Sequence, residues 1–375
     1  MRVPRLDGID RPDGTEVTQG GTIRLVASGE NLELVWPSIE GATLNRVDGT
    51  TYTFTIDEGS PLGPRALHLD DLVVTDALVV VPTVVDAATG RDDASGTAAH
   101  PLRTLAHAVD LRRAAGSQIS LTAGTHEVTD GMVIGGGVTI TGAGVSATTL
   151  SVPSCGTFLY CIALHGTLSN LRIHSGVDKA LAVGQDGVLG DAELSGGGDA
   201  LVLQQRARAL RVSITGASRG IVVIPENVVV EDCQIRDTSG AGLTVLGLTS
   251  DGRLTVERTV VERTDAGLLT STDYPLAVTV RGSTFAENRY GVRMTYTDDA
   301  LALDMGSPLS PGGNVFRDNQ THILDERSPR STADGIIATF AGSTFNGIDP
   351  EGVIVGQDAE LPLYNVVNAH NRLAF

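Results

Sequence analysis

Pairs of apolar residues recur along the second half of the chain at a nearly constant short spacing. Within each pair the separation is 7 or 8 residues, whereas the first members of successive pairs lie 20 to 31 residues apart. Each repeat thus has a segment of constant length, the fixed arm, and a segment of variable length, the variable arm. This pattern is expected of a solenoid, in which two strands meet at a tight corner and loops project elsewhere. The pairs are Ile173 with Leu181, Leu194 with Leu201, Ile214 with Ile221, Ile235 with Leu243, Val261 with Leu268, Phe285 with Val292, and Phe316 with Ile323.

Alternation within these segments gives the strand period. Apolar residues occupy every second position, as in Leu171 and Ile173 or Val212 and Ile214, which indicates strands with one buried face. The sequence therefore predicts a right-handed parallel β-helix. The longest loops are expected on the variable arm, at residues 247–253, 270–277 and 295–313.

Small polar residues follow the first apolar position of the later pairs at a fixed distance. They are Thr238, Thr264, Asn288 and Asn319. Side chains of this kind satisfy backbone groups at turns, and neighbouring strands lie about 4.8 Å apart. We predict a structural ladder of hydrogen bonds along one corner.

Composition and charge narrow the class of protein. The chain is 41% hydrophobic but only 4% aromatic and has 45 glycines, which favours many short strands and an all-β fold. The formal net charge of −18 disfavours nucleic acid and anionic lipid as partners. No apolar stretch reaches 18 residues, so we expect no direct membrane insertion.

The first 82 residues show short alternating runs separated by Gly, Pro, Asp and Asn, which is typical of a β-sandwich. The segment from Gly20 to Leu32 resembles the opening of the immunoglobulin-like domains shared by plexins and transcription factors. The resemblance covers about 75 residues, and such domains serve as spacers or binding modules in bacterial surface proteins.

Residues 102–114 have helical apolar spacing and predict a short helix that caps the solenoid. Gly96-Thr97, Pro101-Leu102-Arg103-Thr104-Leu105 with Ala108, and Ile119 to Gly124 together resemble the leading segment of bacterial pectate-lyase-like β-helix proteins. Many of that group have no assigned activity. We predict an immunoglobulin-like β-sandwich at 1–82, a leading segment with a capping helix at 83–118, the parallel β-helix at 119–327 and a C-terminal cap at 328–375.

A charged face is predicted beside the fixed corner of the coils. One interpretation is a ladder of exposed ion pairs, which contribute about 0 to 1 kcal/mol each. The other is a sugar-binding groove or a catalytic arginine with carboxylates. The face comprises Arg236, Asp237, Glu262, Arg263, Glu287, Arg289, Arg317 and Asp318, of which Arg263, Arg289, Asp237, Glu262 and Glu287 are the catalytic candidates.

Binding candidates lie on the variable arm. They are Tyr274, Tyr296, Asp298 and Asp299. Calcium is an open alternative there and at Asp86, Asp92 and Asp93, although calcium takes 6 to 8 oxygen ligands and these residue types also form turns. We expect no other cofactor. Motifs that resemble those of polygalacturonases, pectin methylesterases and alginate epimerases do not occur.

Cys155 and Cys161 bracket a five-residue segment, and a disulfide between them fits an oxidising compartment. We therefore expect an extracellular or cell-surface protein whose export signal lies outside this sequence. The favoured function is a non-catalytic module that binds glycan or matrix, or associates with itself. The alternative is a polysaccharide lyase or glycoside hydrolase acting on acidic polysaccharide.

Overall fold

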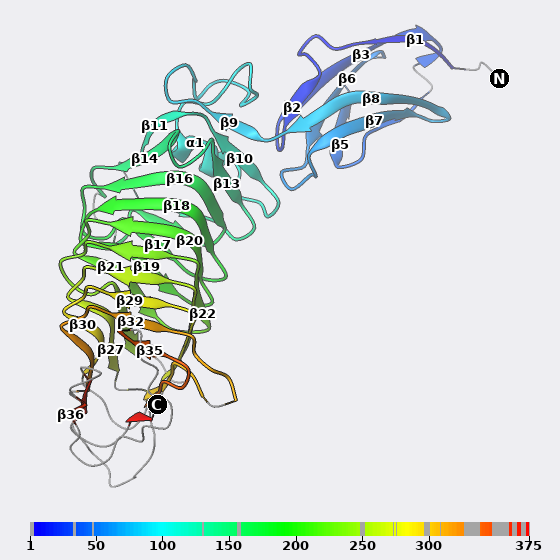
Figure 1. Ribbon diagram of the computed structural model, residues 1–375. Coiled ribbons are helices and arrows are strands. Elements are labelled where there is room, and N and C mark those ends of the chain that lie inside the picture. Colours follow the sequence, from blue (N-terminus) through cyan, green and yellow to red (C-terminus); the bar gives the residue numbers. More distant parts are fainter. Residues whose placement is uncertain are drawn as a thin grey trace. The chain divides into compact units, whose positions relative to one another are not determined.

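A computed structural model of the chain describes residues 4–32, 35–46, 49–129, 131–155, 159–247, 252–272, 274, 276–295, 301–307, 309–325, 338–346, 360–361, 366–368 and 373–374. The chain forms two compact units, shown in Figure 1. Unit 1 comprises Met1–Glu127 with Ile134–Thr148, and unit 2 comprises Val128–Val133 with Thr149–Phe375. Within the described part, no helix is long and apolar enough to cross a membrane.

Unit 1 begins with two four-stranded sheets in the orders β1-β3-β6-β5 and β2-β8-β7-β4. Alternation decides which side chains are buried: in β6, Tyr52, Phe54 and Ile56 are buried and the threonines between them are not. The immunoglobulin-like assignment stays a prediction. The strands are β1 (Arg5–Asp10), β2 (Glu16–Thr18), β3 (Thr22–Glu30), β4 (Pro37–Ser38), β5 (Ala42–Arg46), β6 (Thr51–Ile56), β7 (Gly63–Leu69) and β8 (Leu72–Val81).

The predicted helix of the leading segment is confirmed as α1 (Leu105–Leu111), shorter than the apolar spacing suggested. Thr104 caps its N-terminus by accepting a hydrogen bond from the backbone N–H of His107. Leu105, Ala108 and Val109 are buried, and α1 packs against β9 and β10. The strands here are β9 (Thr83–Val85), β10 (Gln118–Leu121), β11 (Gly124–Glu127) and β13 (Thr139–Gly142).

Unit 2 is a parallel β-helix, and both predicted inward columns are confirmed in register. The first runs through Ile173, Leu194, Ile214, Ile235, Val261, Phe285 and Phe316. The second runs through Leu201, Ile221, Leu243, Leu268, Val292 and Ile323. The first column continues at Phe345, which pairs with Phe316 beyond the predicted end of the β-helix.

Two long sheets carry these columns. The first, called sheet C here, contains β14 (Thr148–Val152), β16 (Thr167–Ser175), β18 (Val188–Gly196), β20 (Arg208–Thr215), β22 (Val228–Glu231), β23 (Gln234–Arg236), β25 (Gly252–Glu257), β26 (Val260–Glu262), β28 (Leu276–Arg281), β29 (Thr284–Ala286), β31 (Leu301–Asp304), β32 (Val315–Arg317), β34 (Ala338–Thr339), β35 (Thr344–Phe345) and β38 (Leu373–Ala374). The second, called sheet E, contains β12 (Met132–Ile134), β15 (Ile162–Leu164), β17 (Leu181–Val183), β19 (Asp199–Gln204), β21 (Arg219–Ile224), β24 (Leu243–Gly247), β27 (Ala266–Thr272), β30 (Tyr290–Thr295), β33 (Thr321–Asp325), β36 (Glu360–Leu361) and β37 (Val366–Asn368).

The predicted ladder of small polar residues is confirmed for Thr264, Asn288 and Asn319, whereas Thr238 donates locally to the carbonyl of Gly240. Thr264 donates from Oγ1 to Oδ1 of Asn288 at 2.8 Å, and the backbone N–H of Asn288 donates to Oδ1 of Asn319 at 3.0 Å. The amide of Asn319 donates to the carbonyl of Phe285 at 2.8 Å. All these groups are buried, so each hydrogen bond satisfies a polar atom that would be costly to bury without a partner.

A glycine column follows this ladder, at Gly220, Gly242, Gly267 and Gly291. A Cβ atom at Gly267 would lie 2.6 Å from both the carbonyl oxygen of Gly291 and Cδ1 of Phe285. These positions must be glycine because the apolar column of sheet C fills the space that a side chain would need.

Beyond the glycine column, His322 lies inside the coil against stacked aromatic rings. The rings of Phe316 and Phe345 stack 4.7 Å apart, and the imidazole meets both edge-on. Nδ1 of His322 lies 3.1 Å from the side-chain amide of Asn319, whereas Nε2 is buried without a partner among the described residues. Burial lowers the pKa of His322 to about 4, and the charge of Asp318 opposes that shift.

This environment predicts a pH-dependent stability. The unfolded chain takes up a proton on His322 near pH 6.5, whereas the folded chain resists it until about pH 4. The contribution of the neutral ring is therefore complete above pH 6.5 and declines as the pH falls towards 4, by up to about 3 kcal/mol. Urea denaturation at pH 7.5 and pH 5 should show a smaller pH dependence for His322→Phe than for wild type, and an equal dependence would contradict the assignment.

Candidate functional site

The corner between the two inward columns carries the predicted charged face. Here the backbone is left-handed at Asp237 (φ 57°), Arg263 (φ 54°) and Glu287 (φ 56°). Residues other than glycine rarely adopt this conformation, which costs them about 1 kcal/mol or more. The bend leaves the three side chains exposed to solvent, while the residue after each one joins the buried polar ladder.

An ion pair links two of these exposed side chains, Arg263 and Asp237, from one coil to the next. Arg263 donates from Nε to Oδ1 of Asp237 at 2.7 Å and from Nη2 to Oδ2 at 3.2 Å, and its Nη1 lies 2.8 Å from Oε1 of Glu262. The hydrogen bonds from Arg263 hold the pKa of Asp237 below its ordinary value. The same bonds raise the pKa of Arg263. Both groups remain charged at neutral pH.

The same device recurs at two other bends of the coil. In each case both partners have a left-handed backbone, successive coils supply them, and the guanidinium holds the pKa of the aspartate below its usual value. Pairs this exposed add little to stability because solvent screens them. The Nε–Oδ1 distances are 2.6 Å for Arg211–Asp191, 2.7 Å for Arg258–Asp232 and 2.7 Å for Arg206–Asp186.

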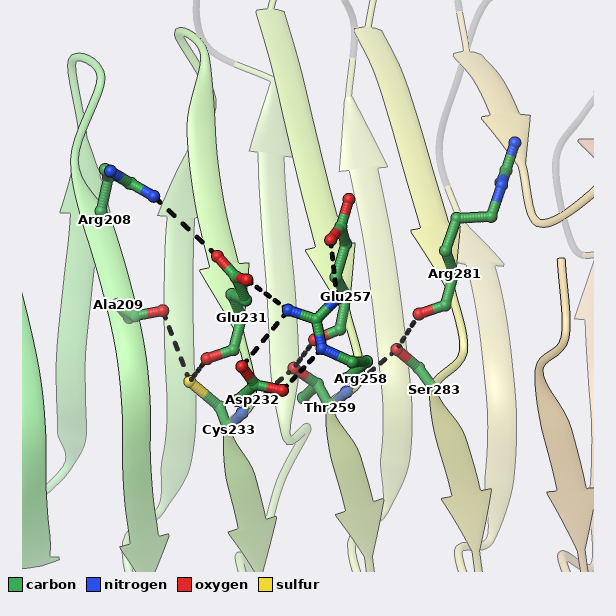
Figure 2. A network of polar contacts seen from close by, with 10 residues as sticks. All are labelled: Arg208, Ala209, Glu231, Asp232, Cys233, Glu257, Arg258, Thr259, Arg281 and Ser283. Carbon is green, nitrogen blue, oxygen red and sulfur yellow. Dashed lines mark hydrogen bonds and ion pairs between the residues drawn. The ribbon is translucent and has the colours of Figure 1, made fainter. Parts of the chain in front are cut away.

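Figure 2 shows the densest of these networks, around Arg258. Its guanidinium contacts Glu231 and Asp232, at the end of β22, and Glu257, the last residue of β25. Carboxylates surround the guanidinium, so this arginine is not placed to act as a base toward a substrate. The arrangement supports the structural interpretation of the charged side chains.

Behind this network lies a second buried polar ladder, also visible in Figure 2. Thr259 donates from its backbone to Oγ of Ser283 at 3.1 Å, and its own Oγ1 lies 3.4 Å from the backbone nitrogen of Cys233. Cys233 occupies the ladder position that Thr and Ser fill on later coils, and its thiol donates to the carbonyl of Ala209. Burial raises the pKa of Cys233 to about 11, so the thiol stays protonated.

The other candidates of the charged face do not converge on one point. Arg289 lies 3.4 Å from Asp265, and its guanidinium lies 4.9 Å from the ring centre of Tyr290. Arg236 approaches Glu262 at 3.8 Å, whereas Glu287 has no ion-pair partner among the described residues. Arg317 pairs with its chain neighbour Asp318.

Of the predicted binding residues, the structure describes only Tyr274, which is 47% exposed. Tyr296, Asp298 and Asp299 lie outside the described residues. Within the described ranges, no group of three or more His, Cys, Asp or Glu side chains is arranged to hold a metal ion.

The three aspartates of the leading segment act locally. Asp86 accepts hydrogen bonds from the backbone of Ala88 and Thr89, and Asp92 accepts them from Arg103 and Thr104. Asp93 forms an ion pair with Arg91. Their oxygens therefore brace turns and the start of α1, as short acidic side chains commonly do.

A cluster of polar and charged residues beside the disulfide was not predicted from the sequence. The predicted Cys155–Cys161 disulfide is present, and Tyr160 is the last residue of the loop that it closes. Lys179, the only lysine of the chain, has Nζ 5.9 Å from the ring centre of Tyr160. Each of the four members of the cluster lies two positions before an inward-facing residue of sheet E. Aligning the coils on those inward residues would have brought the four together. We call Tyr160, Lys179, Asp199 and Arg219 the lysine cluster.

A buried carboxylate sits in the lysine cluster. Asp199 pairs with Lys179 on one side and with Arg219 on the other in the β register. Arg219 donates to both of its oxygens, at 2.6 and 2.8 Å, and the carboxylate is only 9% exposed. Burial, and then the charge of Asp199, raise the pKa of Tyr160.

A second missed feature is a polar concavity of about 460 Å³ at the corner where sheet E turns back to sheet C. Its wall combines amides, carboxylates and one guanidinium from three successive coils. Tight left-handed turns place them there, with φ of 49° at Gln185 and 52° at Gln205. The corner concavity, as we call it, is lined by Gln185, Asp186, Gln205, Arg206 and Glu226.

No protein-family model matches the chain, and no curated protein matches it. At 11–12% identity and TM-scores below 0.5, the similar solved structures carry no argument about what this chain does. They include pectate lyase Pel9A (11% identity, 72% of this chain and 82% of that chain, TM-score 0.42), the catalytic domain of GH87 alpha-1,3-glucanase in complex with tetrasaccharides (11%, 87% and 75%, 0.35), and the Azotobacter vinelandii mannuronan C-5 epimerase AlgE4 A-module (12%, 64% and 91%, 0.28).

The left-handed bend generates a prediction about Arg263. Arg263→Ala removes the ion pair but keeps a Cβ atom in a left-handed backbone, whereas Arg263→Gly removes the pair and relieves the strain. The Gly variant should therefore be more stable than the Ala variant by about 1 kcal/mol, as urea denaturation midpoints will show. A folded Arg263→Ala protein that has lost an activity of the wild type would contradict the structural role.

Proposed function

We propose that the protein binds a polysaccharide at the corner concavity of unit 2. The observation that carries this proposal is the set of planar hydrogen-bonding groups on three successive coils. Amide, carboxylate and guanidinium groups can bond the neighbouring hydroxyls of a sugar ring. Coils stack about 4.8 Å apart, so the same types of group recur along the axis and suit an extended, repeating ligand.

The charges of the concavity favour a neutral polymer. Arg206 donates to both oxygens of Asp186, at 2.7 and 2.8 Å, so these two side chains neutralise each other. Glu226 adds a negative charge, and the chain as a whole carries −18. A polyuronate would be repelled from such a site, whereas hydroxyl groups can donate to these carboxylates.

The carboxylates favour binding over hydrolysis at this place. A glycoside hydrolase needs one carboxyl group that stays protonated near neutral pH. The hydrogen bonds from Arg206 hold the pKa of Asp186 below its usual value, so Asp186 does not suit the role of that acid. A non-catalytic binding role therefore accords best with the corner concavity.

We also propose that the protein acts in an oxidising compartment outside the cytosol. The Cys155–Cys161 disulfide supports this location, because disulfides persist where thiols are not kept reduced. A glycan ligand at a cell surface or in a matrix fits the same location.

The concavity is tested by affinity electrophoresis and calorimetry of the full chain with soluble neutral polysaccharides. Glu226→Ala removes a charged acceptor and should weaken binding about tenfold or more, because a hydrogen bond to a charged group contributes about 1.5 to 3 kcal/mol. Gln205→Asn shortens an amide and keeps a residue that tolerates the left-handed turn, so a smaller loss is expected. Arg263→Gly, at another corner, is the matched control. Unchanged binding in both concavity variants would refute the site.

A second function, β-elimination of an acidic sugar, is favoured by one observation in the lysine cluster. The phenol of Tyr160, a possible proton donor, lies beside the cation of Lys179, whose Nζ is 5.9 Å from its ring centre. Lys179 supplies an amine beside it, while the guanidinium of Arg219 holds Asp199 in place behind them.

This second function predicts an absorbance increase from unsaturated products when the protein is incubated with polygalacturonate or alginate. Tyr160→Phe and Lys179→Arg should each lower that rate at least 100-fold, the usual contribution of a positioned acid or base. Glu226→Ala should leave the rate unchanged. Wild-type protein that gives no such absorbance with either polymer, with or without added calcium, excludes elimination of these substrates.

A further inference from the structure

The only tryptophan of the chain lies on the surface of unit 1. Trp36 is 69% exposed, although large aromatic side chains are usually mostly buried. The burial pattern shows which way it points. Val35, Pro37 and Ile39 are buried, whereas the residues that follow each of them, Trp36, Ser38 and Glu40, are exposed. Trp36 therefore lies on the outer face of the sheet β2-β8-β7-β4 and takes no part in the core.

Neighbouring strands extend this outer face. Ser38 of β4 pairs with His68 of β7, and His68 pairs with Val73 of β8, so the three side chains form one row across the sheet. Val73 is 54% exposed. The row and Trp36, two residues before Ser38, make a face with an indole ring, an aliphatic side chain and an imidazole.

Acidic residues border this face. Asp70, with φ of 52°, and Asp71 form the turn between β7 and β8, and Glu40 follows β4. All three are exposed and have no ion-pair partner among the described residues. The border repels anionic polymers and offers acceptors to hydroxyl groups.

We propose that the Trp36 face of unit 1 is a second saccharide-binding site, specific for a neutral sugar. The indole ring covers the apolar C–H face of a pyranose, and its N–H, which donates to no described residue, bonds a ring substituent. The carboxylates at the border accept bonds from the hydroxyls. The proposal shares its ligand class with the proposed function of unit 2 but depends on different residues.

Fluorescence of the full chain tests this site directly, because Trp36 is its only tryptophan. Laminarihexaose, cellohexaose and maltohexaose serve as neutral probes, and hexagalacturonate as the acidic one. We expect at least one neutral hexasaccharide to shift the emission to shorter wavelength in a saturable manner. Hexagalacturonate should cause no shift.

Variants separate this site from the corner concavity. Val73→Asp should weaken the emission response at least fivefold, while Leu309→Ala, which truncates another exposed apolar residue, should leave it unchanged. Glu226→Ala should retain the emission response even though it weakens binding at the concavity. If sugar shifts the emission but does not bind at the corner concavity, the Trp36 site stands and the concavity is refuted. If sugar binds at the concavity but does not shift the emission, only the Trp36 site is refuted.

Two outcomes would overturn the proposal. One is the absence of any emission change with the three neutral hexasaccharides at millimolar concentration. The other is a blue shift that depends on protein concentration without sugar, which would identify the face as a contact between two copies of the chain. Calorimetry with Trp36→Ala completes the test, since the heat assigned to this site must disappear.

Discussion

The left-handed bend at the corners of the β-helix is the constraint on which the rest of unit 2 depends. Each bend turns one side chain outwards and the next one inwards. The inward residue is polar after Asp237, Arg263 and Glu287 and apolar after Asp191 and Arg211. Parallel stacking then aligns each kind into a column. The apolar columns, the buried ladders and the exposed ion pairs all follow from this geometry.

Acidic and basic residues occupy many of these bends where glycine would be easier to accommodate. Asp191 faces Arg211, and Asp237 faces Arg263, each from a left-handed backbone. The pairing offsets part of the conformational cost but contributes little by itself because the side chains are exposed. Charged columns at a corner are therefore expected of the architecture, and they are weak indicators of an active site.

The sequence predicted the β-helix well because inward residues must be apolar on every coil. The spacing from Ile235 to Leu243 or from Phe285 to Val292 follows from one corner and needs no knowledge of distant contacts. The buried Thr and Asn ladder was predictable for the same reason. The corner concavity was not, since polar residues such as Gln205 and Glu226 look like any other turn until the coils are stacked. The lysine cluster was missed because its members lie on four coils, and only the register aligns them.

Function in this architecture is expected where polar side chains converge without neutralising one another completely. The corner concavity meets that condition through Gln185, Gln205 and Glu226, which line it beside a single ion pair. The bend at Asp237 and Arg263 does not, because its charges are already paired. The two places therefore differ in what they can offer a ligand.

Hydrogen exchange of the full chain, with and without a saturating neutral polysaccharide, tests this distinction most directly. We expect new protection at the turns that line the concavity, at residues 184–187, 204–207 and 225–228. No new protection is expected at the corner where Asp237 and Arg263 form their ion pair. Protection confined to residues 236–239 and 262–265 would contradict this expectation, because the charged corner would then be the binding surface.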